Sequence, residues 1–226
     1  MSNILLSYPR TGSSWTRYIL ECFSGVAVDG HYDMKSVSKT ISENGFTPLV
    51  DIDNSKFFCT MVHDCSDIRC QPEDISKLCL SFRDPVEVIP SYFYSNNHSN
   101  KNIPIEQFMK NLTVHHIEGL CNQYLKGIQY FNRFSGDKYL LNYNELMVNP
   151  RLAIERLTRF FGCYTDGMLD RFMSQYEQHK SMMLKFKSMP KHMSVNTSGR
   201  VGIISKMLSG EVKEYLDKTF KGVTVS

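Results

Sequence analysis

The chain has 226 residues, 42% of them hydrophobic and 22% charged, which suits one substantial core and gives no sign of a second. We therefore expect a single domain over residues 1–226. A formal net charge of +3 is too small to indicate nucleic-acid binding, and the apolar run after Met1 is too short for a signal peptide or a membrane span.

Strand and helix patterns alternate along the chain. The predicted strands span 3–8, 56–62, 78–82 and 138–142. The predicted helices span 14–24, 85–95, 104–111, 114–133, 150–161 and 166–178, and 29–55 is a polar stretch. Such alternation is typical of an α/β fold with a mainly parallel central sheet and helices on both faces. The basic, Met-rich segment 180–197 is either a mobile segment that closes over a ligand or a plain surface loop.

The turn after the first strand has the layout of an anion-binding loop. Residues 4–6 form the apolar strand, Gly12 permits a backbone path that a Cβ would obstruct, and the amides of 13–15 open the next helix. Such amides are unpaired and partly positive, so an anion gains hydrogen bonds and dipole stabilisation there. Arg10 adds a cation, and two serines add hydroxyl donors. The loop lacks the Lys and the glycine spacing of a Walker A motif.

The strand 78–82 also ends in a basic residue, Arg83, at a helix start. Asp84 is a suitable N-cap, and Glu87 three residues later completes a predicted capping box. Ser91 follows Arg83 by a little over two helical turns and so returns to the same face. An Arg fork beside a hydroxyl suits a dianionic phosphate, and α/β sheets bind ligands at the carboxyl ends of their strands.

The run Tyr8-Pro9-Arg10-Thr11-Gly12-Ser13-Ser14-Trp15 resembles the 5′-phosphosulfate loop of the cytosolic-type sulfotransferases that use 3′-phosphoadenosine 5′-phosphosulfate (PAPS). The resemblance extends from about Ile4 to Leu208. It implies the sulfotransferase fold, with a P-loop-like phosphosulfate loop, and transfer of a sulfuryl group from PAPS to a hydroxyl or amine of a small-molecule acceptor. The cofactor-binding residues that it implies are Arg10, Thr11, Gly12, Ser13, Ser14, Trp15, Arg83, Ser91, Tyr143, Ser198, Gly199 and Arg200.

The resemblance also implies individual roles. Arg83 and Ser91 would grip the 3′-phosphate of PAPS, and Trp15 would lie against the adenine. Tyr143 matches an adenine contact, although a half-buried strand aromatic is an equal alternative. The segment 197–202 keeps the two glycines of the last nucleotide segment of the family but not its basic pair, so it is either a phosphate contact or a flexible basic loop.

His63 and Arg10 are the candidates for catalysis. His63 ends a predicted strand where the resemblance implies a general base, and a neutral imidazole can accept the proton of the acceptor. Arg10 stands where many relatives have Lys, and it would stabilise the leaving phosphate by charge because a guanidinium barely deprotonates. Other candidate bases are Asp33, Asp64, His31 and His98.

No metal is expected, because the spacing of Cys59, His63, Cys65 and Cys70 matches no standard zinc motif. Seven cysteines, an odd number, favour free thiols in a reducing compartment, and we expect a cytoplasmic location. The polar segments 29–50 and 94–103 are expected to help build the acceptor pocket.

Two other functions fit part of the pattern. A P-loop-type small-molecule kinase would share the strand, loop and helix, but it requires Mg²⁺ and a loop Lys. A noncatalytic nucleotide-binding protein would bind the nucleotide without needing His63. The identity of the acceptor and the oligomeric state stay open. Pro90 predicts a helix kink just before Ser91 that either aims the hydroxyl or misplaces it.

Overall fold

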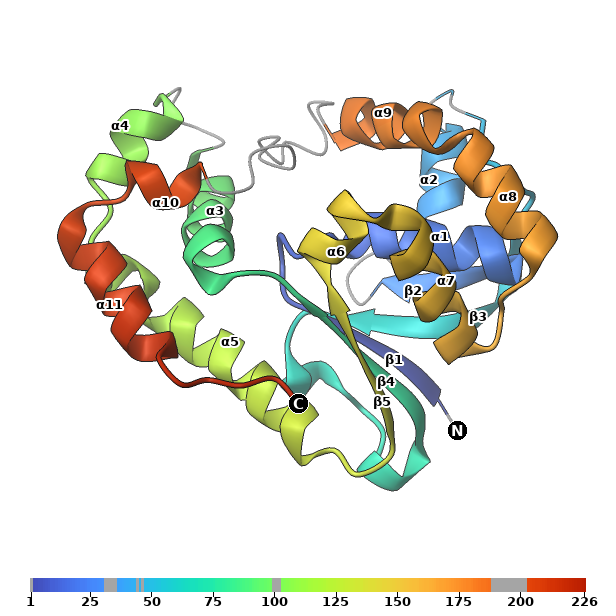
Figure 1. The fold of residues 1–226 in the computed structure, drawn as a ribbon, viewed down its shortest axis with the longest axis horizontal. Coiled ribbons are helices and arrows are strands. Elements are labelled where there is room, and N and C mark those ends of the chain that lie inside the picture. Colours follow the sequence, from blue (N-terminus) through green and yellow to red (C-terminus); the bar gives the residue numbers. More distant parts are fainter. Residues whose placement is uncertain (1, 31–35, 44, 46, 99–102, 188–202) are drawn as a thin grey trace.

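The computed structural model describes every residue except 1, 31–35, 44, 46, 99–102 and 188–202. Within the described residues, a parallel sheet of five strands in the order β2-β3-β1-β4-β5 forms the centre (Figure 1). The strands are β1 (Ser2–Ser7), β2 (Val26–Gly30), β3 (Asp53–Val62), β4 (Ile75–Phe82) and β5 (Asp137–Asn142). Because β1 lies between β3 and β4 and the strands are parallel, the segments that follow these three strands leave the sheet side by side, at the carboxyl ends of the strands.

Helices cover both faces of the sheet, as the alternating pattern predicts (Figure 1). Leu5 of β1 packs into one core and its neighbours Ile4 and Leu6 into the other, because side chains alternate along a strand. The layer over Leu5 contains α1 (Ser13–Ser24), α2 (Val37–Glu43), α6 (Tyr143–Val148), α7 (Pro150–Phe161), α8 (Asp166–Ser174) and α9 (Tyr176–Lys187). The opposite layer contains α3 (Pro85–His98), α4 (Ile105–Lys110), α5 (Val114–Arg133), α10 (Ile204–Met207) and α11 (Gly210–Phe220).

Local signals place several helix ends where the sequence predicts them. Pro85 and Pro150 occupy the first positions of α3 and α7, where a missing amide costs nothing. Gly162 ends α7 at φ 77°, which confirms the predicted stop. The short 3-10 turns 65–67 and 72–74 connect β3 to β4.

Some elements differ from the prediction. The polar stretch 29–55 contains the end of β2 and the whole of α2, and the carboxylate of Glu21 ties the two together by accepting from the amides of Val28 and Val37. The pattern of apolar residues within one segment does not reveal these contacts, because they join residues 7 and 16 positions apart. The single helix predicted over 166–178 is two helices that meet at Gln175. The helices α6 and α10 were not predicted because they have only six and four residues, and the amphipathic helix α11 was missed.

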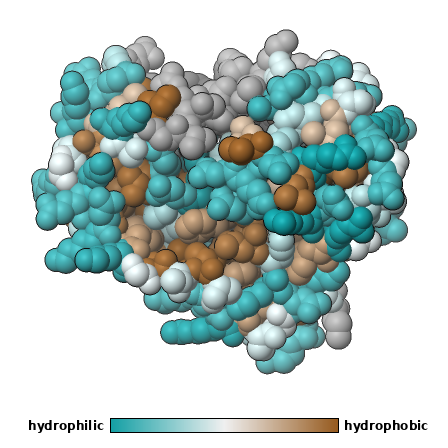
Figure 2. All heavy atoms as spheres, in the orientation of Figure 1, coloured by the Kyte–Doolittle hydropathy of each residue, from teal (hydrophilic) through white to brown (hydrophobic). Residues whose placement is uncertain are grey.

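The face of the molecule in Figure 2 is mostly hydrophilic, with apolar side chains gathered in a few patches. Among the described residues the large hydrophobic side chains that stay exposed are Phe57, Val148, Ile203 and Val223. None of the helices in the described part of the chain combines the length and the apolar character needed to cross a bilayer. The single domain predicted for residues 1–226 stays a prediction.

Candidate functional site

The loop between β1 and α1 is tied down by hydrogen bonds to its own strand and to β4. The Thr11 hydroxyl donates to the Tyr8 carbonyl oxygen at 2.7 Å and lies 3.0 Å from the Ser7 hydroxyl. The Ser81 hydroxyl of β4 donates to the Thr11 carbonyl oxygen at 2.8 Å. The Thr11 side chain is fully buried, so it shapes this loop from within. Arg10 has a φ of 75°, a left-handed conformation that non-glycine residues rarely adopt.

Gly12 is required by the close approach of Tyr143. Gly12 has a φ of 91°, and a Cβ on it would lie 2.6 Å from Cδ2 and Cε2 of the Tyr143 ring. Tyr143 is the first residue of α6 and is 4% exposed. The structure therefore joins the first predicted loop to the third predicted motif by direct packing. Tyr143 is a buried aromatic here, and its predicted contact with adenine stays a prediction.

The first backbone amides of α1 follow directly after Gly12, its N-cap residue. The amides at a helix start have no partner within the helix, and those of Ser13, Ser14 and Trp15 are in this position. Ser13 and Ser14 are half-buried, and the first turn of α1 contains no acidic residue. An anion placed at this end therefore meets donors and a favourable helix dipole, with no carboxylate in the turn to oppose it.

Arg10, Arg83 and Ser91 come together beside this loop, although 73 and 81 positions separate Arg10 from the other two. Arg10 Nε donates to the Ser91 hydroxyl at 3.2 Å, and Arg83 Nη1 donates to the Arg10 carbonyl oxygen at 3.2 Å. Ser91 is fully buried in α3, one residue after Pro90, which the helix accommodates. Burial, and then the charge of Arg83, lower the pKa of Arg10 to about 10. Arg10 is still a cation at neutral pH.

Arg83 is buried with two of its donor atoms unused. Its side chain is 2% exposed, and its guanidinium carbon lies 5.0 Å from the centre of the Tyr143 ring, in cation–π range. The Tyr124 hydroxyl donates to the Arg83 carbonyl oxygen at 2.5 Å and anchors its backbone. In the part of the chain that the structure describes, Arg83 Nε and Nη2 have no hydrogen-bond partner. Buried donors are nearly always paired, so two such atoms on one buried cation are unusual.

The predicted capping box at the start of α3 is wrong in one half. The Asp84 carboxylate does cap the helix, accepting from the Val86 amide at 2.9 Å. Glu87 does not reach back to complete the box, because its carboxylate is buried against Arg83 and accepts from the amide of Ser205 in α10 at 3.1 Å. Sequence reasoning missed this role of Glu87, although the four-residue spacing from Arg83 is that of a helical ion pair.

His63 lies beside the same loop because β3 and β1 are neighbours. Its Nδ1 is 2.5 Å from the Ser7 carbonyl oxygen, which can only accept, so Nδ1 carries the proton. In the neutral ring the basic nitrogen is then Nε2. Asp64, another candidate base, instead accepts from the amide and hydroxyl of Ser66. Burial raises the pKa of Asp64, but the hydrogen bonds from Ser66 outweigh it and leave that pKa below its ordinary value.

Trp15 is in the aromatic core, 7% exposed, and its ring stacks on Tyr18 at 5.8 Å. It also lies 5.9 Å from Phe172 and 5.7 Å from Tyr176, and the Tyr18 hydroxyl is hydrogen-bonded to His179 Nδ1 at 2.7 Å. This cluster joins α1 to α8 and α9. The contact of Trp15 with adenine stays a prediction.

Several predicted site residues lie outside the described residues. These are Ser198, Gly199 and Arg200 of the last motif, together with His31 and Asp33 and the side chain of His98. The predicted acceptor segments 29–50 and 94–103 are described only in part. Within the described part of the chain, no cluster of three or more His, Cys, Asp or Glu residues has the geometry to hold a metal.

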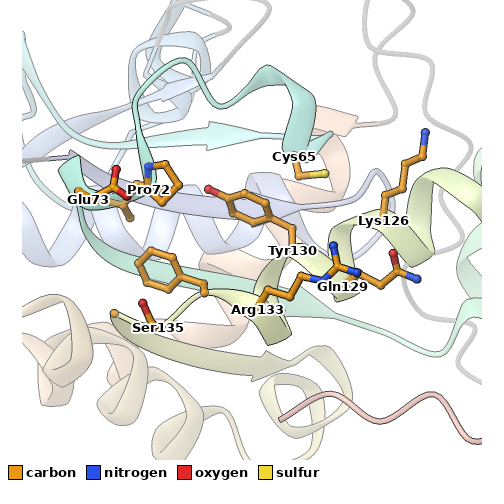
Figure 3. A pocket seen from close by; sticks show the side chains of 11 residues that line it. Cys65, Pro72, Glu73, Lys126, Gln129, Tyr130, Arg133 and Ser135 are labelled. Atoms are coloured by element: carbon orange, nitrogen blue, oxygen red, sulfur yellow. The ribbon is translucent and has the colours of Figure 1, made fainter.

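A separate cavity of about 490 Å³ lies at the other end of the strands, where β4 and β5 begin (Figure 3). Ile75, the first residue of β4, and Gly136, just before β5, line it. The Tyr130 ring lies between Pro72 and Cys65 in Figure 3. None of the predicted site residues lines this cavity, so the candidate site remains at the carboxyl ends of β1, β3 and β4.

Comparisons with known proteins found a matching family and a similar solved structure. A family model described as "Sulfotransferase domain" matches residues 72–223. The solved structure of mouse sulfotransferase SULT7A1 complexed with PAP is similar at a TM-score of 0.62 with 16% sequence identity, covering 97% of this chain and 82% of that chain. At 16% identity this similarity shows that the two proteins share a fold. No curated protein matches the chain. The loop at residues 8–15 lies outside the range matched by the family model.

Proposed function

The chain belongs to the sulfotransferase family, and from this premise we propose that it transfers a sulfuryl group from PAPS to a hydroxyl or amine of a small-molecule acceptor. One observation carries the proposal. Arg83, buried beside Arg10 and Ser91 at the carboxyl end of β4, has no hydrogen-bond partner for Nε or Nη2 among the described residues. This fork of donors suits two oxygens of a phosphate group.

The described residues fit the donor at two places. The start of α1, with Gly12 before it, offers amides and a positive dipole end to the 5′-phosphosulfate. Arg83 and Ser91 offer a guanidinium and a hydroxyl to the 3′-phosphate. Arg10 connects the two places, because its Nε donates a hydrogen bond to the Ser91 hydroxyl and its carbonyl oxygen accepts one from Arg83. PAPS, when bound, supplies the sulfuryl group and leaves as adenosine 3′,5′-bisphosphate.

The chain itself supplies two groups for the reaction, His63 as a base and Arg10 as a cation. The Ser7 carbonyl oxygen holds His63 in the tautomer with Nε2 basic, and we infer that Nε2 takes the proton of the acceptor. Arg10, with a pKa of about 10, stays charged at neutral pH and stabilises the negative charge that gathers on the leaving phosphate. Because Arg10 is partly buried, water screens that interaction less than it would at an exposed position.

The seven cysteines are all free thiols in the structure, which supports the cytoplasmic location that we also propose. The thiols of Cys59 and Cys79 are fully buried, and burial raises the pKa of each, so these two are inert packing groups.

The test of the proposed function is transfer of radiolabelled sulfate from PAPS to pooled hydroxyl- and amine-bearing acceptors, with EDTA present throughout. We expect label to appear in an acceptor, because sulfuryl transfer by Arg10 and the α1 amides requires no divalent cation. Label transfer from ATP that requires Mg²⁺ would instead identify a kinase. Tight binding of PAPS with no acceptor labelled in any pool would favour a noncatalytic nucleotide-binding protein.

A further inference from the structure

Arg83 and Glu87 form a buried ion pair with an unusual geometry. Arg83 Nη2 lies 3.8 Å from Glu87 Oε2, and the two side chains are 2% and 4% exposed. Charged groups that pair directly approach to about 2.8 Å and share a hydrogen bond. Here Arg83 Nε, Arg83 Nη2 and Glu87 Oε2 all lack a hydrogen-bond partner among the residues described. Glu87 therefore compensates the charge of Arg83 without using the two donors that an anion needs.

A second element holds Glu87 at this distance. Its other oxygen, Oε1, accepts from the backbone amide of Ser205 at 3.1 Å, across 118 positions of the chain. Ser205 lies in α10, which packs against α3 and buries Ile204 completely. The amide of α10 thus restrains the carboxylate from closing onto the guanidinium. Arg10 also lies beside Arg83, and its positive charge adds to the need for a counter-ion.

We propose that Glu87 is a positioning residue that serves as the resident counter-ion of Arg83 until the 3′-phosphate of the donor takes over that role. The inference rests on the proposed function of Arg83. A buried guanidinium without a partner destabilises a protein strongly, so Glu87 stabilises the protein before the donor binds. Once the phosphate is bound at Arg83, the phosphate and the Glu87 carboxylate are two neighbouring negative groups and repel each other. Glu87 therefore weakens the hold on adenosine 3′,5′-bisphosphate and favours release of this product.

The test is Glu87→Gln, which keeps the shape and an oxygen for the Ser205 amide but removes the charge. Calorimetry on the full chain compares adenosine 3′,5′-bisphosphate with adenosine 5′-phosphate, which lacks the 3′-phosphate. We expect the variant to bind the bisphosphate about tenfold more tightly than the wild type does, with the monophosphate changed by less than about twofold. Glu118→Gln removes the same charge from an exposed position of α5 and should change neither affinity by more than about twofold.

The outcomes separate this inference from the proposed function. Bisphosphate binding that is unchanged or weaker in Glu87→Gln overturns the counter-ion role, while a wild-type preference for the bisphosphate leaves the proposed function standing. A wild type that binds both nucleotides equally overturns both. Should Glu87→Gln fail to fold alone, refolding is the measurement. The bisphosphate, but not the monophosphate, should restore the yield, and rescue by both or by neither contradicts the role.

Discussion

Arg10, which is partly buried, and Arg83, which is buried, bring two positive charges together, and Glu87 supplies only one negative charge beside them. The lowered pKa of Arg10 reports the cost of this arrangement, because burial and the neighbouring guanidinium both disfavour its charged form. A phosphate bound at Arg83 would offset the repulsion and move the pKa of Arg10 back towards its ordinary value. This arrangement supports the proposal that the two arginines bind a polyanionic ligand.

Replacing Arg83 tests its assignment directly. Arg83→Ala removes the unpaired fork, so we expect binding of adenosine 3′,5′-bisphosphate to weaken by about 100-fold, from the loss of charge-assisted hydrogen bonds. Binding of adenosine 5′-phosphate should change far less, since it has no group for the fork. Calorimetry on both nucleotides measures the difference. Arg156→Ala, an exposed Arg paired with Glu145, is the matched control. Equal losses for both nucleotides would refute the role.

For His63→Ala we expect turnover to fall by about 100-fold or more while the affinity for adenosine 3′,5′-bisphosphate stays unchanged. The reason is that a general base acts on the acceptor and not on the nucleotide. Initial rates with PAPS and calorimetry give the two numbers. His116→Ala serves as a control, since His116 is an exposed residue that caps α5 through Thr113. Turnover that survives in His63→Ala would move the base to another residue.

At the scale of elements, the β1–α1 loop depends on one glycine for two different reasons. Gly12 adopts a positive φ, and it also lies under the Tyr143 ring of α6. The first reason is local and is evident in the strand, turn and helix pattern. The second depends on where α6 is placed, and α6 was not predicted. Sequence reasoning therefore identified the right residue while missing the contact that makes any Cβ there collide.

Gly12→Ala separates these two reasons when it is compared with Gly25→Ala. Gly25 also has a positive φ, 67°, but a Cβ there meets nothing within 4 Å. We expect Gly25→Ala to lower the free energy of unfolding by about 1 kcal/mol. Gly12→Ala should cost more and also weaken nucleotide binding, because the Tyr143 ring has to move. Urea titration and calorimetry measure these effects, and equal stability losses with nucleotide binding intact would contradict the packing argument.

At the scale of the whole molecule, the order of the strands assembles the site. Because β1 is central, its loop meets His63 after β3 on one side and Arg83 after β4 on the other. Tyr143 after β5 then closes over Gly12. The predicted α/β class with a mainly parallel sheet is confirmed. It could be predicted because strands that alternate with helices along a chain form parallel sheets. The order of the strands is not encoded in any one segment.

The amino-acid sequence by itself determined the loop at residues 8–15, the strand and helix around Arg83, and the membership of an α/β class, because turn chemistry and periodicity act over a few residues. Only the tertiary structure decided that Glu87 accepts a hydrogen bond from the Ser205 amide, and that the Ser7 carbonyl oxygen sets the tautomer of His63. These contacts join residues up to 118 positions apart. They exist because strand order and helix packing bring distant backbone segments within hydrogen-bond reach, which no local pattern specifies.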